Sequence, residues 1–344
     1  MILLTGGLGY IGSHLAAHLM RLGHDVILVD NLSNARMEML QRLEYIAGRY
    51  VTFFRLDIRN TPALQKIFEQ YAISVVIHCA GMKSNTDSAM QPLDYYNSNV
   101  GGTMSLLRVM QRTGVRNLVY GSSAVVYGNP VTLPIAEDAP LNPLTPYGKS
   151  LQLCEEMMHD LVRAEGDWRV VVLRYFNVAG AHPDGVLGEA PSGIVTNLLP
   201  YLAQVARGER SQLEVFGDDY DTPDGSGVRD FIHVIDLVDG HMKALDWLFR
   251  QQQATFEVFN LGRGQGTSVL EMMDLFNQTI GKIVPFETLE RRAGDVAELR
   301  ADTTKAKNVL GFEATQDVDT MVKDLWKFYQ QLGRSEERRV GKEC

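Results

Sequence analysis

Short, continuous apolar runs alternate with longer amphipathic stretches along the first half of the chain. Half-exposed strands alternate apolar and polar residues, whereas parallel strands that are buried on both faces of a sheet are apolar throughout. The alternation of such runs with helical patterns therefore predicts a doubly wound, parallel α/β sheet. We expect its strands at residues 1–4, 25–29, 51–56, 74–78, 117–120 and 169–173.

Two longer helical patterns, residues 92–113 and 146–164, lie between these strands, and each offers a second apolar face to a partner subunit. From Asn177 the pattern changes to glycine, proline and acidic loops. We interpret residues 1–176 as a nucleotide-binding domain and residues 177–333 as a smaller, mixed α/β substrate-binding lobe. No Gly/Ser linker divides them, so they are expected to share a cleft. Strand candidates of the second lobe are residues 213–216, 256–260 and 283–288.

The composition is typical of a globular protein with a small-molecule ligand. Hydrophobic residues make up 45% and charged residues 22% of the 344 residues, and the net charge is -9. Nucleic acids and anionic membranes attract basic patches, which this chain lacks, so neither is expected as a partner. No apolar run approaches the length of a membrane span, and we expect no leader peptide, because strand-like residues already begin at Ile2. Cys79, Cys154 and Cys344 form no disulfide framework, which predicts a cytoplasmic location.

The last segment, residues 334–344, does not continue the apolar periodicity before it. It is almost entirely polar, and it resembles an in-frame translation of a sequencing adapter. We expect it to be a non-native tail, with the natural reading frame lost after Gly333, and we exclude it from the fold prediction.

A glycine-rich loop, Thr5-Gly6-Gly7-Leu8-Gly9-Tyr10-Ile11-Gly12, follows the first predicted strand and precedes a helical pattern. Without Cβ atoms the turn is tight, the backbone can approach a diphosphate, and the helix packs closely on its strand. The N-terminal amides of that helix then face the anion. The strand, loop and helix together predict a dinucleotide site.

Asp30 ends the second predicted strand and bears on the identity of the dinucleotide. Its carboxylate can accept both hydroxyls of an adenosine ribose and repels a 2′-phosphate, which favours NAD over NADP. Asp57 and Ile58 follow the third strand, where they can flank the adenine. For both acids the alternative is a helix N-cap, and Arg36 leaves NADP open as a second cofactor.

Ser123 and Tyr147 are the candidate catalytic pair. Ser123 lies where the fifth strand ends, and the carboxyl ends of parallel strands face the ligand cleft. A serine hydroxyl and a phenol are suited to bind a substrate alcohol and to take its proton while hydride leaves for a nicotinamide. An ordinary phenol, with a pKa of about 10, is a poor base at neutral pH and needs a nearby cation.

These motifs resemble those of the extended short-chain dehydrogenases/reductases and, among them, of the UDP-glucose 4-epimerases. The resemblance covers the chain to about Gln331 and implies a Rossmann-like fold. It also implies NAD-dependent C4 epimerisation of UDP-glucose and UDP-galactose through a transient 4-keto intermediate, in a homodimer. It is carried by residues 5–14, 30–31, 78–83, 122–128, 146–150, 173–177, 227–234 and 291–295.

The resemblance assigns roles to single residues, with Ser123 and Tyr147 as the catalytic pair. The NAD contacts it implies are Gly6, Gly9, Tyr10, Ile11, Gly12, Asp30, Asn31, Asp57, Ile58, Lys83 and Tyr147. The UDP-hexose contacts are Ser123, Asn177, Asn197, Arg229, Arg292, Asp295 and Leu299. The planar forks of the two arginines suit phosphate oxygens. A salt bridge is the alternative for Arg292, and a turn or cap is the alternative for Asn177 and Asn197.

One position departs from the family pattern beside the catalytic tyrosine. Where the family has a lysine four residues after that tyrosine, this chain has Leu151, which continues the apolar stripe of Cys154 and Met158. Residues four apart share a helix face, so Tyr147 lacks its ammonium neighbour. Lys149 lies roughly 200° around the helix and points elsewhere. We expect low activity with NAD binding retained.

A second departure is Leu299, where the family often has a tyrosine beside the sugar. The smaller side chain leaves room for an N-acetyl group, so UDP-N-acetylglucosamine is a further candidate substrate. Residues 217–225 superficially resemble a calcium loop, but their carboxylate spacing is wrong, and the histidines lack HExxH spacing. No metal is therefore expected.

Two other functions stay open from the sequence. Leu151 favours a non-catalytic homologue that binds NAD and a UDP-sugar. Another nucleotide-sugar-modifying enzyme of the same superfamily, such as a dehydratase, would need an acid near the serine, and Ser123-Ala124-Val125 offers none.

Overall fold

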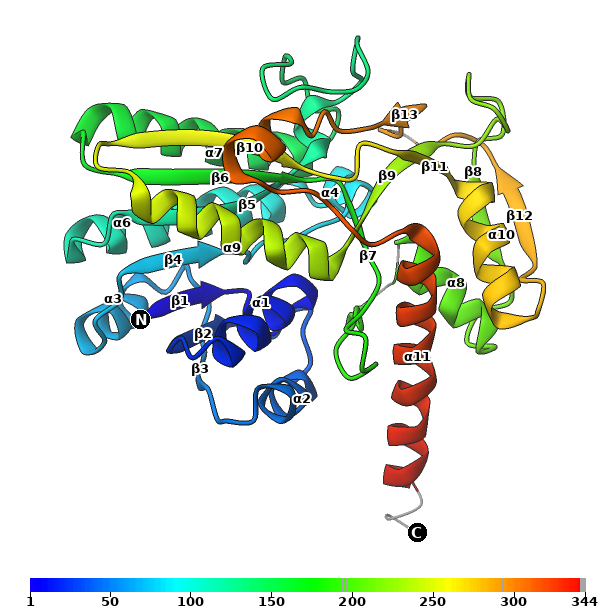
Figure 1. Ribbon diagram of the computed structural model, residues 1–344, viewed down its shortest axis with the longest axis horizontal. Helices are drawn as coiled ribbons and strands as arrows, with labels where there is room; N and C mark the ends of the chain where they lie inside the picture. Colours follow the sequence, from blue (N-terminus) through cyan, green and yellow to red (C-terminus); the bar gives the residue numbers. More distant parts are fainter. Residues whose placement is uncertain (194, 196, 293, 341–344) are drawn as a thin grey trace.

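The computed structural model describes residues 1–193, 195, 197–292 and 294–340, with side chains up to residue 332. Its described residues form a seven-stranded parallel sheet in the order β10-β6-β5-β4-β1-β2-β3 (Figure 1). The predicted doubly wound α/β fold is therefore confirmed. The strands are β1 (Ile2–Thr5), β2 (Val26–Asp30), β3 (Thr52–Arg55), β4 (Val75–His78), β5 (Asn117–Ser123), β6 (Arg169–Tyr175) and β10 (Thr255–Leu261).

Helices cover both faces of this sheet, as continuous apolar strands require. One face packs against α1 (Tyr10–Arg21), α2 (Glu38–Ala47) and α9 (Val234–Arg250). The other packs against α3 (Thr61–Gln70), α6 (Gly102–Thr113) and α7 (Pro146–Glu165). Before α6, the chain passes through α4 (Asn85–Met90), α5 (Pro92–Tyr95) and a π-helical turn η1 (Tyr96–Gly101). The predicted helix 92–113 is thus helical throughout, with a π turn inside it.

The second lobe is built around β9 (Val228–His233), which pairs with three short strands beside the large sheet (Figure 1). Its apolar core joins three helices to strands β7, β8 and β9. The other elements of this region are β7 (Asn177–Ala179), α8 (Leu198–Ala206), β8 (Leu213–Phe216), β11 (Gly266–Ser268), α10 (Val269–Ile280), β12 (Phe286–Leu289), β13 (Glu298–Leu299), η3 (Ala306–Leu310) and α11 (Val318–Val340).

The chain crosses between the lobes more often than expected. The strand predicted at residues 256–260 is present as β10, but it pairs in parallel with β6 at the edge of the large sheet. Its assignment to the second lobe was wrong, because an apolar run does not reveal which strand it pairs with. The division of the chain at 176/177 otherwise stays a prediction.

The last helix, α11, continues to Val340, so the first part of the predicted tail has a helical backbone. Residues 341–344 lie outside the described part, and the non-native origin of the tail stays a prediction. Among the described residues, no helix has the length and apolar character needed to cross a membrane.

Candidate active site

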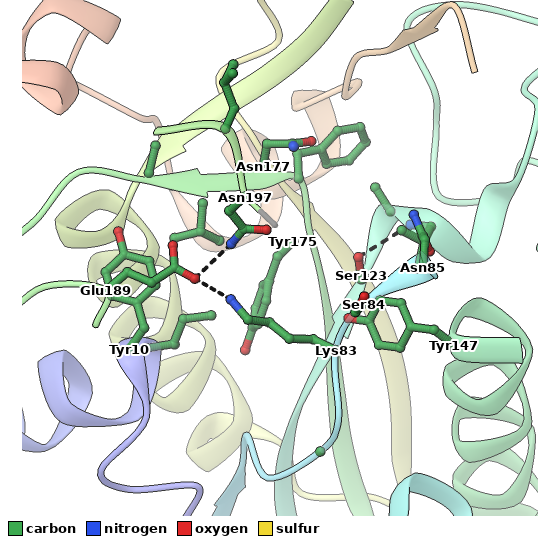
Figure 2. Close-up of a pocket in the computed structure, with 18 of the residues that line it drawn as sticks. Tyr10, Lys83, Ser84, Asn85, Ser123, Tyr147, Tyr175, Asn177, Glu189 and Asn197 are labelled. Atoms are coloured by element: carbon green, nitrogen blue, oxygen red, sulfur yellow. Dashed lines mark hydrogen bonds and ion pairs between the residues drawn. The ribbon is translucent and has the colours of Figure 1, made fainter. Parts of the chain in front are cut away.

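A cleft of about 490 Å³ lies at the carboxyl edge of the large sheet, with walls from both lobes (Figure 2). This volume is in the usual range for small-molecule sites, roughly 300–1,000 Å³. Most of the predicted site residues line it, namely Gly6, Gly9, Tyr10, Ile11, Gly12, Lys83, Ser123, Tyr147, Asn177, Asn197, Arg229, Arg292, Asp295 and Leu299. Asp30, Asn31, Asp57 and Ile58 are not among the lining residues.

The glycine loop has the geometry that a dinucleotide needs. Gly6 has a φ of +67°, and a Cβ there would lie 2.8 Å from the amide nitrogen of Ala80. A Cβ on Gly12 would lie 2.1 Å from the carbonyl oxygen of Gly6. Larger residues at either position would push apart the strand, the loop and the helix. The loop thus keeps its backbone next to the start of α1, where free amides attract a diphosphate.

Asp30 lies directly beneath this loop and is buried. Its carboxylate accepts the amides of Leu32 at 2.8 Å and Leu8 at 3.1 Å. Burial raises the pKa of Asp30, and these amide bonds oppose the rise. The helix-cap alternative is wrong for this acid, because the next helix begins at Glu38 with Met37 in the cap position.

Asp57 is held in a local ion pair instead of capping a helix. Its carboxylate accepts two bonds from Arg59, at 2.9 and 2.7 Å, and one from Asn31 at 3.2 Å. The hydrogen bonds from Arg59 hold the pKa of Asp57 well below its usual range. Asn60 caps α3, so the cap alternative is wrong here too. Ile58 is buried in the core.

Ser123 and Tyr147 meet in the cleft, as predicted (Figure 2). Thr145 caps α7 by accepting the amide of Gly148 at 3.3 Å, and Pro146 stands in the first turn, so Tyr147 points from the start of the helix. Burial raises the pKa of Tyr147 to about 12, and a hydrogen bond with Ser123 acts in the opposite direction. At neutral pH the phenol is therefore almost entirely protonated.

Leu151 is a packed core residue that also lines the cleft. It is 6% exposed, and Cys154 and Met158 continue its apolar stripe along α7. Lys149 is exposed and is not among the cleft-lining residues. No ammonium therefore replaces the missing lysine from this helix.

The second lobe contributes an unpaired guanidinium. Arg229 lines the cleft and donates to the carbonyl oxygen of Val228 at 2.8 Å, but within the described part of the chain no carboxylate forms an ion pair with it. Burial lowers the pKa of Arg229 from its ordinary value, and Asp295 opposes this shift. Arg229 is half-buried, and its guanidinium keeps donors that are not committed to a carboxylate, so this position is suited to an anionic ligand.

Arg292 and Asp295 also line the cleft, but they form an ion pair with each other. Two nitrogens of Arg292 approach the carboxylate at 3.1 and 3.2 Å, and the guanidinium lies 4.9 Å from the ring centre of Phe216. The predicted salt-bridge alternative for Arg292 is thus present inside the cleft. Asn177 begins β7, and Asn197 stands in the cap position of α8 without a side-chain cap bond.

The loop of residues 217–225 holds no group of ligands suited to a metal, and the same is true elsewhere in the described residues. Asp224 instead accepts the amide of Ser226 at 2.9 Å and bonds to the hydroxyl of Ser268. These bonds tie the loop to the cap of α10.

Residues 2–262 match the family model described as the NAD dependent epimerase/dehydratase family. The chain belongs to this family. It is 47% identical to a UDP-glucose 4-epimerase of Dictyostelium discoideum, with 95% of each chain covered, and 46% identical to that of Homo sapiens, with 96% of each covered. The crystal structure of a UDP-glucose-4-epimerase from Stenotrophomonas maltophila, with bound NAD and formylated UDP-arabinopyranose, superimposes with a TM-score of 0.93 at 43% identity. That match covers 97% of this chain and 99% of the other.

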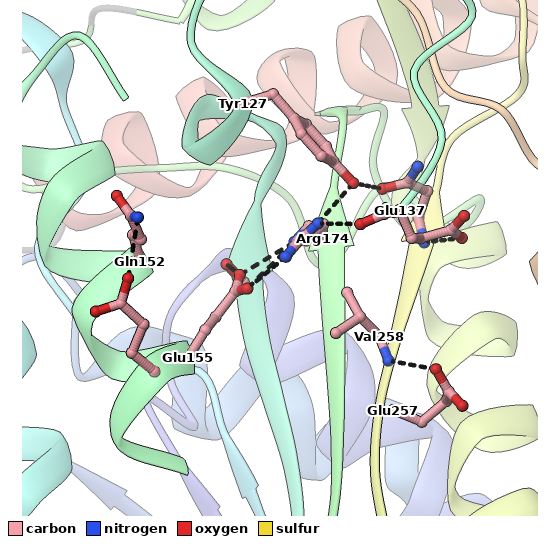
Figure 3. Close-up of polar contacts among 10 residues, drawn as sticks. Tyr127, Glu137, Gln152, Glu155, Arg174, Glu257 and Val258 are labelled. Atoms are coloured by element: carbon pink, nitrogen blue, oxygen red, sulfur yellow. Dashed lines mark hydrogen bonds and ion pairs between the residues drawn. The ribbon is translucent and has the colours of Figure 1, made fainter. Parts of the chain in front are cut away.

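A buried network of this NAD dependent epimerase/dehydratase fold was missed in the sequence (Figure 3). On α7, one turn after Leu151, Glu155 accepts the Ser122 hydroxyl at 2.5 Å and pairs with Arg174 of β6, with a shortest distance of 2.7 Å. Arg174 also donates to the Tyr127 hydroxyl at 2.9 Å. The network joins α7 and β6 to Ser122, which directly precedes Ser123 on β5. No local sequence motif predicts this network, because its residues are far apart in the sequence.

Glu189 is a second residue that the sequence did not reveal. It lines the cleft from the loop before α8, accepts the Asn197 amide at 2.8 Å and forms an ion pair with Lys83 (Figure 2). A single acid in a glycine-rich loop carries no spacing signal.

Proposed function

We propose that the chain interconverts UDP-glucose and UDP-galactose by NAD-dependent epimerisation at C4. The observation that carries the proposal is the meeting of three features in one cleft: the glycine loop, the Ser123–Tyr147 pair and the guanidinium of Arg229 without a carboxylate partner. A related structure from Bifidobacterium longum, 41% identical and with a TM-score of 0.93, is a UDP-glucose 4-epimerase in complex with NAD⁺ and UDP.

The residues present fit NAD. Gly6 and Gly12 leave space that any Cβ would fill, and Asp30 holds the glycine loop by accepting the amide of Leu8. Gly9, Tyr10 and Ile11 are proposed to face the diphosphate at the start of α1, Asp30 and Asn31 the adenosine ribose, and Asp57 and Ile58 the adenine. The cofactor supplies a hydride acceptor that takes hydrogen from C4 of the sugar and returns it.

Tyr147 is proposed to take the proton of the C4 hydroxyl and Ser123 to hold that hydroxyl by a hydrogen bond. Arg229 and Arg292 would hold the UDP diphosphate, with Asp295 orienting Arg292 through their ion pair. Asn177, Asn197 and Leu299 would contact the rest of the nucleotide sugar, since all three line the cleft.

We further propose that turnover is slow. Partial burial raises the pKa of the Tyr147 phenol to about 12, and Leu151 supplies no charge to lower it. Few molecules therefore hold the phenolate at neutral pH. Binding of NAD does not depend on this ionisation and should be retained.

Product analysis with UDP-galactose as the sole addition tests the proposal. We expect UDP-glucose to form without added cofactor, because NAD is regenerated within each cycle. Absorbance of bound NADH without product would indicate a stalled enzyme. Neither signal, with UDP-sugar still bound, would refute the proposal in favour of the non-catalytic homologue. A dehydrated sugar product would support the dehydratase alternative.

The position of Leu299 supports a wider substrate range. Leu299 is paired with Arg229 across β13 and β9 and lines the cleft. The side chain is smaller than a tyrosine, so we propose that UDP-N-acetylglucosamine is also accepted. A coupled assay that compares acetylated and plain UDP-hexoses would test this, and complete exclusion of the acetylated sugar would contradict it.

We propose that the chain forms a homodimer through the helices around α5, α6 and α7. Leu93 on α5 is 79% exposed, and Met104 on α6 and Leu153 on α7 are also exposed apolar residues. Cys79 and Cys154 are free thiols, which supports the reducing cytoplasm as the location. Sedimentation velocity would test the dimer, and mass spectrometry of the protein from its source would test whether residues 334–344 are native.

A further inference from the structure

One carboxylate in the cleft joins the two lobes. The ammonium of Lys83, in the loop after β4, and the amide of Asn197, at the start of α8, both donate to the same oxygen, Oε1 of Glu189 (Figure 2). The Glu189 side chain is 6% exposed, whereas that of Lys83 is 47% exposed. The acid is thus buried, whereas the lysine that pairs with it is half-exposed.

The position of Glu189 is set by contacts on its own backbone and by its neighbours. The Tyr329 hydroxyl of α11 donates to the Glu189 carbonyl oxygen at 3.0 Å. Tyr10, in the first turn of α1, donates from its hydroxyl to the Gly180 carbonyl oxygen at 2.7 Å. Burial and, after it, the negative charge of Glu189 raise the pKa of Tyr10. Glu189 and Tyr10 both line the cleft, and their side chains lie next to each other at the start of α1 (Figure 2).

The start of α1 is also the position at which the diphosphate of a dinucleotide is expected to bind. The amides at the start of α1 attract anions, and the loop that leads to Lys83 packs on the glycine loop, since a Cβ on Gly6 would touch the backbone of Ala80. A carboxylate at this position repels a diphosphate, and it also holds the nearby ammonium in an ion pair. Nothing in the chemistry of proton transfer needs such an acid.

We infer that Glu189 is an internal counter-ion that competes with the cofactor diphosphate for Lys83, and so sets how tightly the chain holds NAD. This inference rests on the proposed function, because it takes NAD as the dinucleotide in the cleft. When the diphosphate is bound, Lys83 is shared between two anions. Loss of the Glu189 charge leaves the whole ammonium to the diphosphate.

Opposite substitutions in the pair should have opposite effects. Glu189→Gln keeps an oxygen that accepts the Asn197 amide and removes only the charge, so NAD should leave roughly two- to fivefold more slowly. Lys83→Gln leaves the carboxylate unpaired beside the diphosphate, so NAD should leave faster. The double variant should return toward the rate of the unchanged chain. A merely structural role would speed NAD release in both single variants.

Asp184→Asn is the matched control. Asp184 is in the same loop, its side chain is 70% exposed, and its ion pair is with His182 at 3.6 Å. This variant removes the same charge without touching Lys83, so the rate of NAD release should stay unchanged. Added salt should reduce the difference between Glu189→Gln and the unchanged chain, because it screens the charges.

The experiment uses the full purified chain. Bound NAD is first extracted and quantified, and its loss after dilution is then followed by filtration and assay of the free NAD. If the unchanged chain holds no NAD, the proposed function fails. If it holds NAD but Glu189→Gln releases it equally fast or faster, the inference on Glu189 fails alone. Should Glu189→Gln not fold, Lys83→Gln is measured at several salt concentrations. Faster NAD release at low salt that approaches the rate of the unchanged chain as salt is added supports the inference, and an unchanged rate or an increase that does not depend on salt overturns it.

Discussion

Leu151→Lys should raise the rate of the proposed epimerisation. With a pKa of about 12, only about one Tyr147 phenol in ten thousand is ionised at pH 8. A cation within about 4–6 Å lowers the pKa of an acidic group by about 1–3 units, which raises the ionised fraction roughly ten- to a thousandfold. A less basic phenolate is also a weaker proton acceptor, so we expect kcat to rise by about ten- to a hundredfold.

The substitution has a cost in stability. Leu151 is 6% exposed in the core, and loss of its burial should lower the free energy of unfolding by about 1.5–3 kcal/mol. Position 151 lines the cleft, so the ammonium of the new lysine can extend into the cleft and need not be buried in the core. Urea titration measures this cost, and activity assays are then made well below the unfolding temperature.

The assay is the initial rate of UDP-galactose conversion from pH 6.5 to 9.5, without added cofactor. In the unchanged chain, kcat should rise about tenfold per pH unit, because the phenolate fraction does so below its pKa. In Leu151→Lys the rise should level off at lower pH. Leu151→Met is the control, since it keeps the volume and adds no charge. No gain in Leu151→Lys, with its NAD content intact, would refute the role given to the missing lysine.

Three further substitutions test other parts of the site. Arg229→Leu should raise KM for UDP-galactose roughly ten- to a hundredfold with bound NAD unchanged, because it removes a charged donor to the diphosphate, and an unchanged KM would exclude that contact. Glu155→Leu should lower the free energy of unfolding in urea by about 3–5 kcal/mol, because it leaves the Arg174 guanidinium buried without a counter-ion. The double variant with Arg174→Met should recover most of this loss, and equal losses would contradict the explanation. Burial lowers the pKa of His241 to about 4, below about 6.5 in the unfolded chain, so the folded state binds fewer protons and stability should fall as pH drops from 6.5 to 4. His241→Gln, which keeps a bond to Tyr175, should lessen this fall, and identical pH slopes would contradict the assignment.

The parts of the fold that depend on local pattern were predictable. Apolar runs gave the strands of the large sheet, and the glycine loop marked the start of α1, because both signals lie within a few neighbouring residues. The placement of Ser123 and Tyr147 in one cleft followed from the same rule, since Ser123 ends a parallel strand and Tyr147 lies in the first turn of a capped helix. Leu151 was correctly predicted to be a packed core residue.

The parts that depend on distant partners were not predictable. Glu155 and Arg174 come from different elements and meet only after the sheet has formed. Glu189 joins Lys83 across 106 positions of the chain. The side chain of Asp57 was also not predictable. Its position allowed a helix cap, but its carboxylate binds the guanidinium of Arg59, and Asn60 caps the helix instead. Whether a polar side chain is buried depends on its hydrogen-bond and ion-pair partners. The topology of the fold decides which partners lie near it.

The edge strand β10 has a consequence for how the protein is made. β6 ends at Tyr175 and pairs with β5 on one side, but β10, which pairs with its other side, begins only at Thr255, after most of the second lobe. While the ribosome is still making that intervening stretch, β6 presents an open edge of unpaired amides and carbonyls, which invites pairing with other chains. The large sheet is therefore complete only after most of the second lobe has been synthesised. A nascent chain that stalls before residue 261 is left with an aggregation-prone sheet rather than a finished NAD-binding unit.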